Sequence, residues 1–445
     1  MAPPRRGNAQ AAAPVSRGAA PPQPAAGLGA GLLRPALGPL AAAAVLLAGG
    51  GAAVVAPPKA EAQLPTSTSQ VKNAKALLRY SLPLQNKPLR EIQFQLETIS
   101  EALRVPGVKF SDVKKAVGRS EKVLRKERKQ ILEAVPAQQR AYADGLLNQL
   151  DAGLKEFDVI NENKDRQEVP IIQQKLLGIV GLVEEAAVKD ADGRWVVPFS
   201  VPAEYDAMPQ LRGRATLKME VKIKDPRERG LDSDGNAEMT IVLDGLNAPV
   251  SSGNMVDLVQ RRFYDGMEIQ RADGFVVQTG DPDGPATGFV DPKTKEPRTV
   301  PFEVRVKGDK LPLYEETMED VGRANEIPVL PFNAYGTLAM ARAEFEPNSA
   351  SSQIFWLLKD SEVTPTGSNL LDGRYAVFGY VTEGADNLGN LEVGDVIKSI
   401  RVVEGLENMT FLPKEEPAPA PAPAAEEPVA DVAQAEGGPA AAGLS

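Results

Sequence analysis

The stretch that decides the fold reads MEIQRADGFVVQTGD and spans residues 267–281. Its pattern is typical of a β-strand followed by a tight turn, with Arg271 just before Gly274-Phe275 and Gln278 just after them. Because side chains in a strand alternate between two faces, a residue's position along this stretch decides which face it presents. The sequence therefore raises the question of whether Arg271 can take part in chemistry.

Composition excludes several classes of function. The chain has 445 residues, 42% hydrophobic and 5% aromatic, which is long enough for two domains with extensions. Its net charge of −10 argues against a protein that binds the phosphates of nucleic acids. Cysteine and histidine are absent from the sequence, which removes disulfides, thiolate nucleophiles, imidazole bases and the usual zinc ligands. We therefore expect no nucleic-acid partner, no metal and no cofactor.

Residues 1–62 have the composition of a targeting sequence. No aspartate or glutamate precedes Glu61, while arginines are scattered through an Ala/Pro/Gly-rich stretch, as in organelle transit peptides. A short apolar run at 40–56 is followed by Ala60-Glu61-Ala62, a site suited to a signal peptidase. Two such signals in series resemble the bipartite presequence of thylakoid-lumen proteins. We expect cleavage after Ala62 and a location in the chloroplast thylakoid lumen; a plain secretory signal or a single anchor is the alternative.

Residues 63–190 carry the periodicity of helices. In the clearest segment, apolar residues recur every three or four positions and so share one helix face: Leu89, Ile92, Leu96, Ile99 and Leu103. Ser111 is expected to cap a second helix that Pro136 stops. Further segments with this pattern lie at 71–82, 147–157 and 172–183. The pattern predicts an antiparallel bundle of all these segments around one core.

Two features of the expected bundle admit functional interpretations. Its heptad-like stripes have the spacing that pairs with another protein, and RSEKVLRKERK, residues 119–129, is basic enough to bind an acidic partner. The alternative is that the stripes form the bundle core and the charges form its solvated outer face.

Residues 213–412 show the pattern of β-strands. The segment RATLKMEVKIK at 214–224 alternates apolar and polar residues, and AEMTIVLD at 237–244 follows a hairpin turn at Asp234-Gly235. This half of the chain is therefore expected to be a β-domain.

The segments that flank the β-domain differ in composition. Residues 191–212 contain Trp195, Phe199 and Tyr205, unlike a flexible linker, so we expect this segment to be packed. Residues 413–445 are acidic and rich in proline and alanine, with too little apolar surface for a core. We expect this tail to be disordered.

Four motifs follow one another within the β-domain. They read APVSSGNMVDLVQRRFYDGMEIQRADGFVVQTGD, GTLAMARA, NSASSQIFWLL and NLLDGRYAVFGYVTEG. In this order they resemble the cyclophilins, the eight-stranded β-barrel family of peptidyl-prolyl isomerases. A helical half before such a barrel resembles in particular the multidomain cyclophilins of the thylakoid lumen. The resemblance implies an α+β multidomain protein, with an N-terminal helical bundle followed by an eight-stranded cyclophilin-like β-barrel.

The resemblance also implies a peptide-binding groove. The family's Gly-Phe-Met-x-Gln-Gly-Gly-Asp segment corresponds to residues 274–281, with a valine in place of methionine. Its Trp-Leu-Asp-Gly motif corresponds to residues 370–373, where leucine replaces the tryptophan, and a tyrosine replaces a histidine of animal members. The implied peptide-binding residues are Phe275, Val276, Gln278, Ala341, Arg342, Phe355, Leu370, Leu371 and Tyr375. For the two phenylalanines the alternative is an ordinary place in a hydrophobic core.

The position of the family's catalytic arginine is altered in this chain. That arginine stands five residues before the phenylalanine, and here the position holds Gln270. Arg271 comes one place later, so strand alternation predicts that it faces away from the groove unless a β-bulge re-aims it. A neutral amide lacks the charge that strengthens hydrogen bonds to the reacting peptide. We therefore expect weak or absent isomerase activity, with Arg271 as the alternative catalytic candidate.

These observations lead to three functional hypotheses. The leading one, which the resemblance implies, is a lumenal protein that binds proline-containing segments and assists photosystem II assembly or maintenance. The alternatives are an active peptidyl-prolyl cis-trans isomerase that acts in protein folding, and a scaffold whose bundle binds and regulates a phosphatase. We also expect an intramolecular contact in which the bundle restrains peptide access to the barrel.

Overall fold

The computed structural model describes residues 71–104, 109–229, 235–359 and 369–410. The expected targeting sequence at 1–62, the start of the expected bundle and the tail at 413–445 lie outside the described residues. Among the described helices, none has the length and apolarity needed to cross a membrane.

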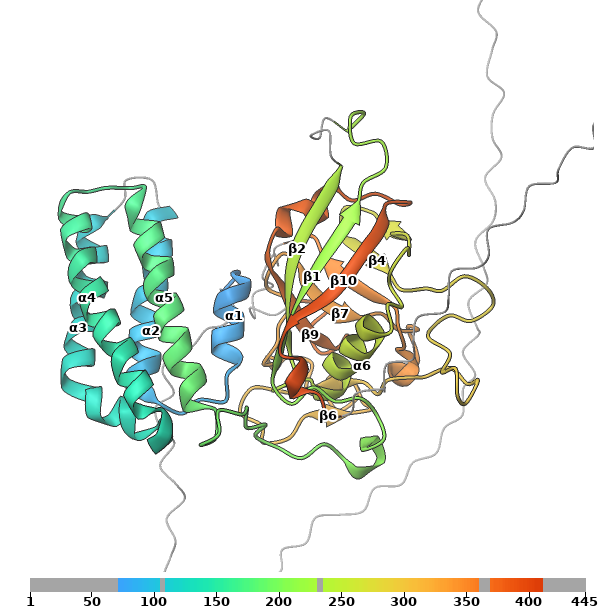
Figure 1. The fold of residues 1–445 in the computed structure, drawn as a ribbon, viewed down its shortest axis with the longest axis horizontal. Coiled ribbons are helices and arrows are strands. Elements are labelled where there is room, and N and C mark those ends of the chain that lie inside the picture. The colour runs from blue at the N-terminus through green and yellow to red at the C-terminus, as the bar shows by residue number, and fades with distance from the viewer. Residues whose placement is uncertain (1–70, 105–108, 230–234, 360–368, 411–445) are drawn as a thin grey trace, which may run out of the picture. The chain divides into compact units, whose positions relative to one another are not determined.

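A four-helix bundle forms most of the N-terminal part of the described chain (Figure 1). Its helices are α2 (Lys87–Arg104), α3 (Phe110–Glu133), α4 (Arg140–Glu162) and α5 (Glu168–Ala187), with the short turn η2 (Ala137–Gln139) before α4. Their apolar stripes meet in one core that includes Leu89, Leu96, Leu124, Leu154 and Leu176. The helical half predicted from the three-and-four spacing is therefore confirmed.

Two details of the helical half differ from the prediction. Helix α3 begins at Phe110, so Ser111 lies inside its first turn and is not the cap. The reason is that Phe110 packs against the bundle core, which extends the helix by one residue. Helix α1 (Ala74–Ser81) does not add to the bundle core, because Leu77 and Leu78 are buried in the core of the β-domain.

The β-domain is built on a curled eight-stranded antiparallel sheet. Its strands, in spatial order, are β10 (Val396–Glu404), β1 (Arg214–Lys222), β2 (Asn236–Asp244), β9 (Val377–Glu383), β7 (Thr337–Met340), β8 (Ile354–Leu357), β4 (Val276–Thr279) and β3 (Arg271–Ala272). Backbone hydrogen bonds between 266–269 and 394–397, such as Ile269 N to Asp395 O at 2.7 Å, join the chain before β3 to β10. These bonds curl the sheet toward the predicted barrel.

Helix α6 (Pro249–Gln260) packs against this sheet with buried residues along nearly its whole length. The insertion between 291 and 332 forms a second sheet of β5 (Glu303–Val304) and β6 (Leu313–Tyr314), with its own small core around Phe302 and Met318. Short 3-10 turns complete the domain: η3 (Ala203–Tyr205), η4 (Pro347–Ser349), η5 (Ala385–Asn390) and η6 (Leu406–Asn408).

Several side chains of the segment 191–212 pack against the protein, while many of its other residues are exposed. Tyr205 is buried, its ring lies 5.4 Å from that of Tyr314, and its hydroxyl donates to Glu315 at 2.6 Å. Trp195 packs on a small cluster with Leu246, and the ammonium of Lys189 lies 4.5 Å from its ring centre. These aromatic contacts agree with a segment that lacks the composition of a flexible linker.

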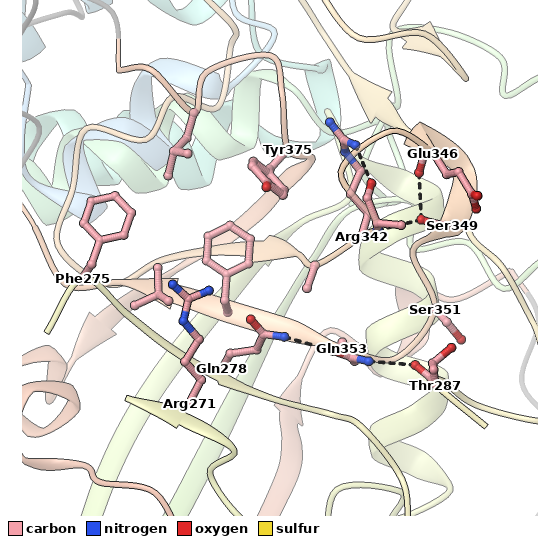
Figure 2. Close-up of a pocket in the computed structure, with 15 residues that line it drawn as sticks. Arg271, Phe275, Gln278, Thr287, Arg342, Glu346, Ser349, Ser351, Gln353 and Tyr375 are labelled. Carbon is pink, nitrogen blue, oxygen red and sulfur yellow. Dashed lines mark hydrogen bonds between the residues drawn. The ribbon is translucent and has the colours of Figure 1, made fainter. Parts of the chain in front are cut away.

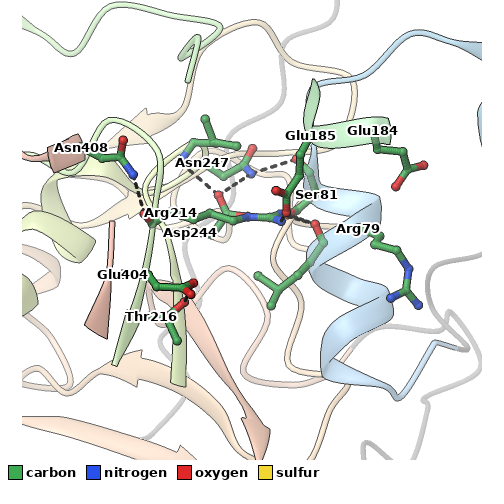
Figure 3. A network of polar contacts seen from close by, with 12 residues as sticks. Arg79, Ser81, Glu184, Glu185, Arg214, Thr216, Asp244, Asn247, Glu404 and Asn408 are labelled. Carbon is green, nitrogen blue, oxygen red and sulfur yellow. Dashed lines mark hydrogen bonds and ion pairs between the residues drawn. The ribbon is translucent and has the colours of Figure 1, made fainter. Parts of the chain in front are cut away.

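A polar network links α1 and α5 to the β-domain (Figure 3). Arg214 on β1 pairs with Asp244 on β2 at 3.3 Å and with Glu185 on α5 at 3.7 Å. The Ser81 hydroxyl, at the end of α1, donates to Asp244, and the Asn247 amide donates to the Ser81 carbonyl at 3.0 Å. We call these five residues the junction network.

Candidate functional site

A groove of about 580 Å³ opens beside β4 and β8 (Figure 2). Arg271, Phe275 and Gln278 line it from the β3–β4 hairpin, and Phe355 lines it from β8. Val276 on β4 also lines the groove, and the remaining lining residues come from the connecting segments around these strands: Thr287, Ala341, Arg342, Ala343, Glu346, Ser349, Ser351, Gln353, Leu371 and Tyr375. The groove is thus built from segments far apart in the sequence that adjacent strands bring together.

An aromatic cluster forms the apolar part of the groove. Phe355 is 5% exposed, its ring stacks on Phe332 at 5.9 Å, and Tyr375 meets it edge-on at 5.3 Å. Phe275 is 40% exposed at the rim. Packing on both sides fixes the Phe355 ring, so it offers a rigid apolar surface of the kind that receives a small apolar side chain.

A chain of amides crosses the groove. The Gln278 side chain donates to the Gln353 carbonyl oxygen at 2.9 Å, and the Gln353 side chain donates to the Thr287 backbone oxygen at 2.8 Å (Figure 2). One N–H of each side-chain amide is therefore occupied, which orients the side chains. The side-chain amide oxygen of Gln278 remains an acceptor for a ligand, since no donor reaches it within the described residues.

Arg342 shapes the opposite wall. Its guanidinium donates to the backbone oxygens of Arg374, Ala343 and Glu344 at 2.7–3.0 Å and lies 5.1 Å from the Tyr375 ring centre. These bonds use its donors within the protein, so the side chain fixes the loop and Tyr375. Within the described chain, the backbone N–H and C=O of Arg342 have no partner and are free to pair with an extended peptide.

Arg271 faces the groove, which is the direction expected if a β-bulge re-aims it. Arg271 is in register with Gln278 on β4, so the two side chains share a face, and both line the groove. The backbone N–H of Gln270 also donates to the backbone oxygen of Gln278 at 3.0 Å. Two consecutive residues, Gln270 and Arg271, therefore lie opposite the single residue Gln278. This irregularity, as in a β-bulge, turns Arg271 toward the groove.

Gln270 does not line the groove. Its side chain forms a closed pair of hydrogen bonds with the backbone of Asp281, at 2.5 Å to the carbonyl oxygen and 3.0 Å from the N–H. The amide at the family's arginine position therefore holds the end of the hairpin.

A carboxylate neutralises Arg271. The Nε and Nη2 atoms of Arg271 donate to one carboxylate oxygen of Asp273 at 2.8 and 2.6 Å. The other oxygen accepts the backbone N–H groups of Phe275 and Val276, both at 2.9 Å. The hydrogen bonds from Val276 and Phe275 lower the pKa of Asp273 to about 2, so its charge is permanent at neutral pH.

One implied site residue lies apart from the groove. Leu370 is 75% exposed and is not among the lining residues, while Leu371, the next residue, is. Of the lining residues that were not assigned, Ala343 and Gln353 lie inside the quoted motifs and were within reach of sequence reasoning. Thr287 and Glu346 lie on loops, where no periodicity marks the side that faces a groove.

Two protein families match the two halves of the chain. Residues 73–188 match the family described as "Peptidyl-prolyl cis-trans isomerase CYP38-like, PsbQ-like domain". Residues 231–410 match "Cyclophilin type peptidyl-prolyl cis-trans isomerase/CLD". The two matches follow the division into helical bundle and β-domain.

Two relatives match about three quarters of this chain. The Arabidopsis thaliana protein named Peptidyl-prolyl cis-trans isomerase CYP38, chloroplastic, is 50% identical over 76% of this chain and 75% of its own length. The Synechocystis sp. protein named "Putative thylakoid lumen peptidyl-prolyl cis-trans isomerase sll0408" is 42% identical over 75% of this chain and 83% of its own length. The first name places that protein in the chloroplast and the second refers to the thylakoid lumen. The location predicted for this protein, the chloroplast thylakoid lumen, is therefore confirmed. The chain therefore belongs to the cyclophilin-type peptidyl-prolyl cis-trans isomerases, and within them to the group that carries a PsbQ-like helical domain.

Proposed function

We propose that this protein binds proline-containing segments of lumenal proteins over Phe355 and isomerises them slowly through Arg271. Photosystem II subunits during assembly or maintenance are its proposed clients. The observation that carries the proposal is the convergence of an aromatic floor, an orienting amide and a guanidinium on one groove.

Binding of the peptide follows from the walls of the groove. A proline ring packs on the Phe355 ring, which Phe332 and Tyr375 hold in place. The extended backbone on either side of the proline pairs with the free backbone groups of Arg342 and with the side-chain amide oxygen of Gln278. This recognition requires no charge on the peptide.

Slow catalysis follows from the surroundings of Arg271. Rotation about a peptide bond faces a barrier of about 18–20 kcal/mol, because resonance keeps the amide planar. A guanidinium that donates to the prolyl nitrogen favours the twisted state, in which that nitrogen has a localised lone pair. Asp273 competes for the same donors, since it occupies Nε and Nη2 in the free groove. The enzyme must therefore give up part of this ion pair to stabilise the transition state.

The proposal is tested with the full chain, an Ala-Pro peptide and two variants. Binding is measured by calorimetry and isomerisation by NMR exchange. Phe355→Ala is expected to weaken binding about tenfold or more through loss of the floor, whereas Arg271→Ala retains binding and loses exchange. Absence of any affinity for proline peptides would refute the binding role. Unchanged exchange in Arg271→Ala would refute the catalytic role alone.

Clients are tested separately. A photo-crosslinking residue at Thr287, on the groove wall, is introduced into the protein in thylakoids. Capture of photosystem II subunits, lost in the presence of excess proline peptide, supports the assignment. Capture confined to other lumenal proteins would overturn it.

A further inference from the structure

A row of cations runs along the outer face of α3. Its members recur at spacings of four and three residues and are all exposed: Lys115, Arg119, Lys122, Lys126 and Lys129. Such spacing keeps the five side chains on one face of a helix. We call this row the α3 stripe. At 1.5 Å per residue it is about 21 Å long.

The stripe lies opposite the buried face of α3. Val113, Val117, Leu124 and Ile131 on the same helix are buried in the bundle core. Packing therefore fixes the rotation of the helix and holds the stripe toward solvent. The placement follows from helix geometry and needs no particular side-chain conformation.

The three central cations of the stripe are unpaired. Within the described residues, Arg119, Lys122 and Lys126 form no ion pair or hydrogen bond, and acidic residues of α3 pair only with the ends of the stripe. Lys115 meets Asp112 at 2.8 Å and Lys129 meets Glu133 at 3.8 Å.

Three other exposed cations of the bundle are each paired with a carboxylate. Lys114 pairs with Glu162 at 3.1 Å, Lys155 with Asp151 at 2.6 Å, and Lys175 with Glu156 at 3.1 Å. The chain as a whole has a net charge of −10. A row of unpaired cations is thus contrary to the net negative charge of the protein and differs from these three paired cations of the same bundle.

We propose that the α3 stripe is a docking surface for an acidic segment of a partner protein. Charge complementarity identifies the chemistry: a row of cations one helix face wide fits carboxylates spaced along an extended or helical segment. A membrane surface fits less well. Helices that lie on membranes insert an apolar face into the lipid, whereas the apolar face of α3 is used in the bundle and none of its large apolar residues is exposed.

The test compares two triple variants of the full chain with equal charge. The stripe variant carries Arg119→Gln, Lys122→Gln and Lys126→Gln. The control variant carries Lys114→Gln, Lys155→Gln and Lys175→Gln, which removes three exposed, paired cations of the same bundle. Thermal unfolding checks that both variants remain folded. The probe is a fluorescent peptide of alternating glutamate and alanine, measured by anisotropy beside its glutamine counterpart.

We expect the wild-type protein to bind the acidic peptide and not its glutamine counterpart, with an affinity that falls as salt is added. The affinity should be about tenfold weaker in the stripe variant and within about twofold of wild type in the control variant. Equal weakening in both variants would overturn the proposal, because binding would then follow net charge. Binding of anionic phosphatidylglycerol vesicles in place of the peptide would assign the stripe to lipid and also overturn it. Peptide binding that appears only after deletion of residues 413–445 would assign the stripe to the acidic tail and reject an external partner.

Discussion

The junction network and the groove each join an arginine to an aspartate, but at different depths. Arg214 is 12% exposed and Asp244 is fully buried, and Ser81 and Glu185 share in their contacts. Arg271 is 54% exposed, and its ion-pair partner is Asp273. A buried pair that is cut off from water holds parts of the fold together, whereas an exposed pair can exchange its partner for a ligand at small cost.

Carboxyl groups in the two regions show the same contrast. Burial raises the pKa of Glu184, beside the junction network, to about 7, although Arg90 lies 3.1 Å from one oxygen. Its other oxygen has no partner among the described residues. Asp273 instead receives two backbone N–H groups that lower its pKa to about 2. Burial and the number of hydrogen-bond donors, and not the residue type, decide which carboxyl group titrates near neutral pH.

The largest loss of stability is expected at the buried ion pair of the junction network. Asp244→Ala leaves Arg214 without its buried counterion and removes the acceptor of Ser81, so it should cost about 3–5 kcal/mol of unfolding free energy. Denaturant unfolding measures this. As a control, Glu383→Ala breaks an exposed pair with Lys75 and should cost no more than about 0.5 kcal/mol. Similar losses in the two variants would break the comparison.

Arg271→Ala is expected to act on activity and not on stability. The exposed pair with Asp273 contributes little to folding, so the unfolding free energy should change by less than about 0.5 kcal/mol. The loss of a donor to the transition state should lower kcat/KM for an Ala-Pro peptide about tenfold to a hundredfold, with KM nearly unchanged. A drop in stability with unchanged kcat would reverse the roles assigned to the two arginines.

Glu184 predicts a pH dependence of stability. Its folded pKa of about 7 lies above the unfolded value of 4.5, so its contribution is complete below pH 4.5 and is lost as the pH rises through 7. This shift already includes the opposing charge of Arg90, and it corresponds to a loss of about 2–3 kcal/mol between pH 5 and 8. Urea unfolding at both pH values should show this loss in the wild type and not in Glu184→Gln. Parallel pH profiles would exclude Glu184 as the source.

The smallest expected effect is a change in the charge preference of the groove. Asp273→Asn keeps an oxygen for the Phe275 and Val276 N–H groups and removes the charge that neutralises Arg271. A peptide with glutamate next to proline should then bind about threefold more tightly than its glutamine counterpart, since exposed charges interact weakly. Calorimetry with the two peptides measures the ratio. An equal ratio in wild type and variant would mean that Asp273 does not set the charge of the groove.

Local pattern determined much of this protein. The three-and-four spacing predicted helices α2 to α5, because one face of each helix must be buried whatever it packs against. The alternation at β1 and β2 predicted strands for the same reason. Resemblance in the quoted motifs supplied the groove residues Phe275, Gln278 and Phe355, which the structure brings together.

The tertiary structure decided what local pattern leaves open. Leu77 and Leu78 predict a buried helix face but not that the β-domain buries it. Strand alternation left the direction of Arg271 open to a β-bulge, and the pairing of the hairpin with β4, which is a contact between two strands, turns it toward the groove. Leu370 carries a family position but lies in solvent. Periodicity reports which side of an element is apolar, whereas the partner of that side, and every departure from regular register, depends on contacts that only the folded chain makes.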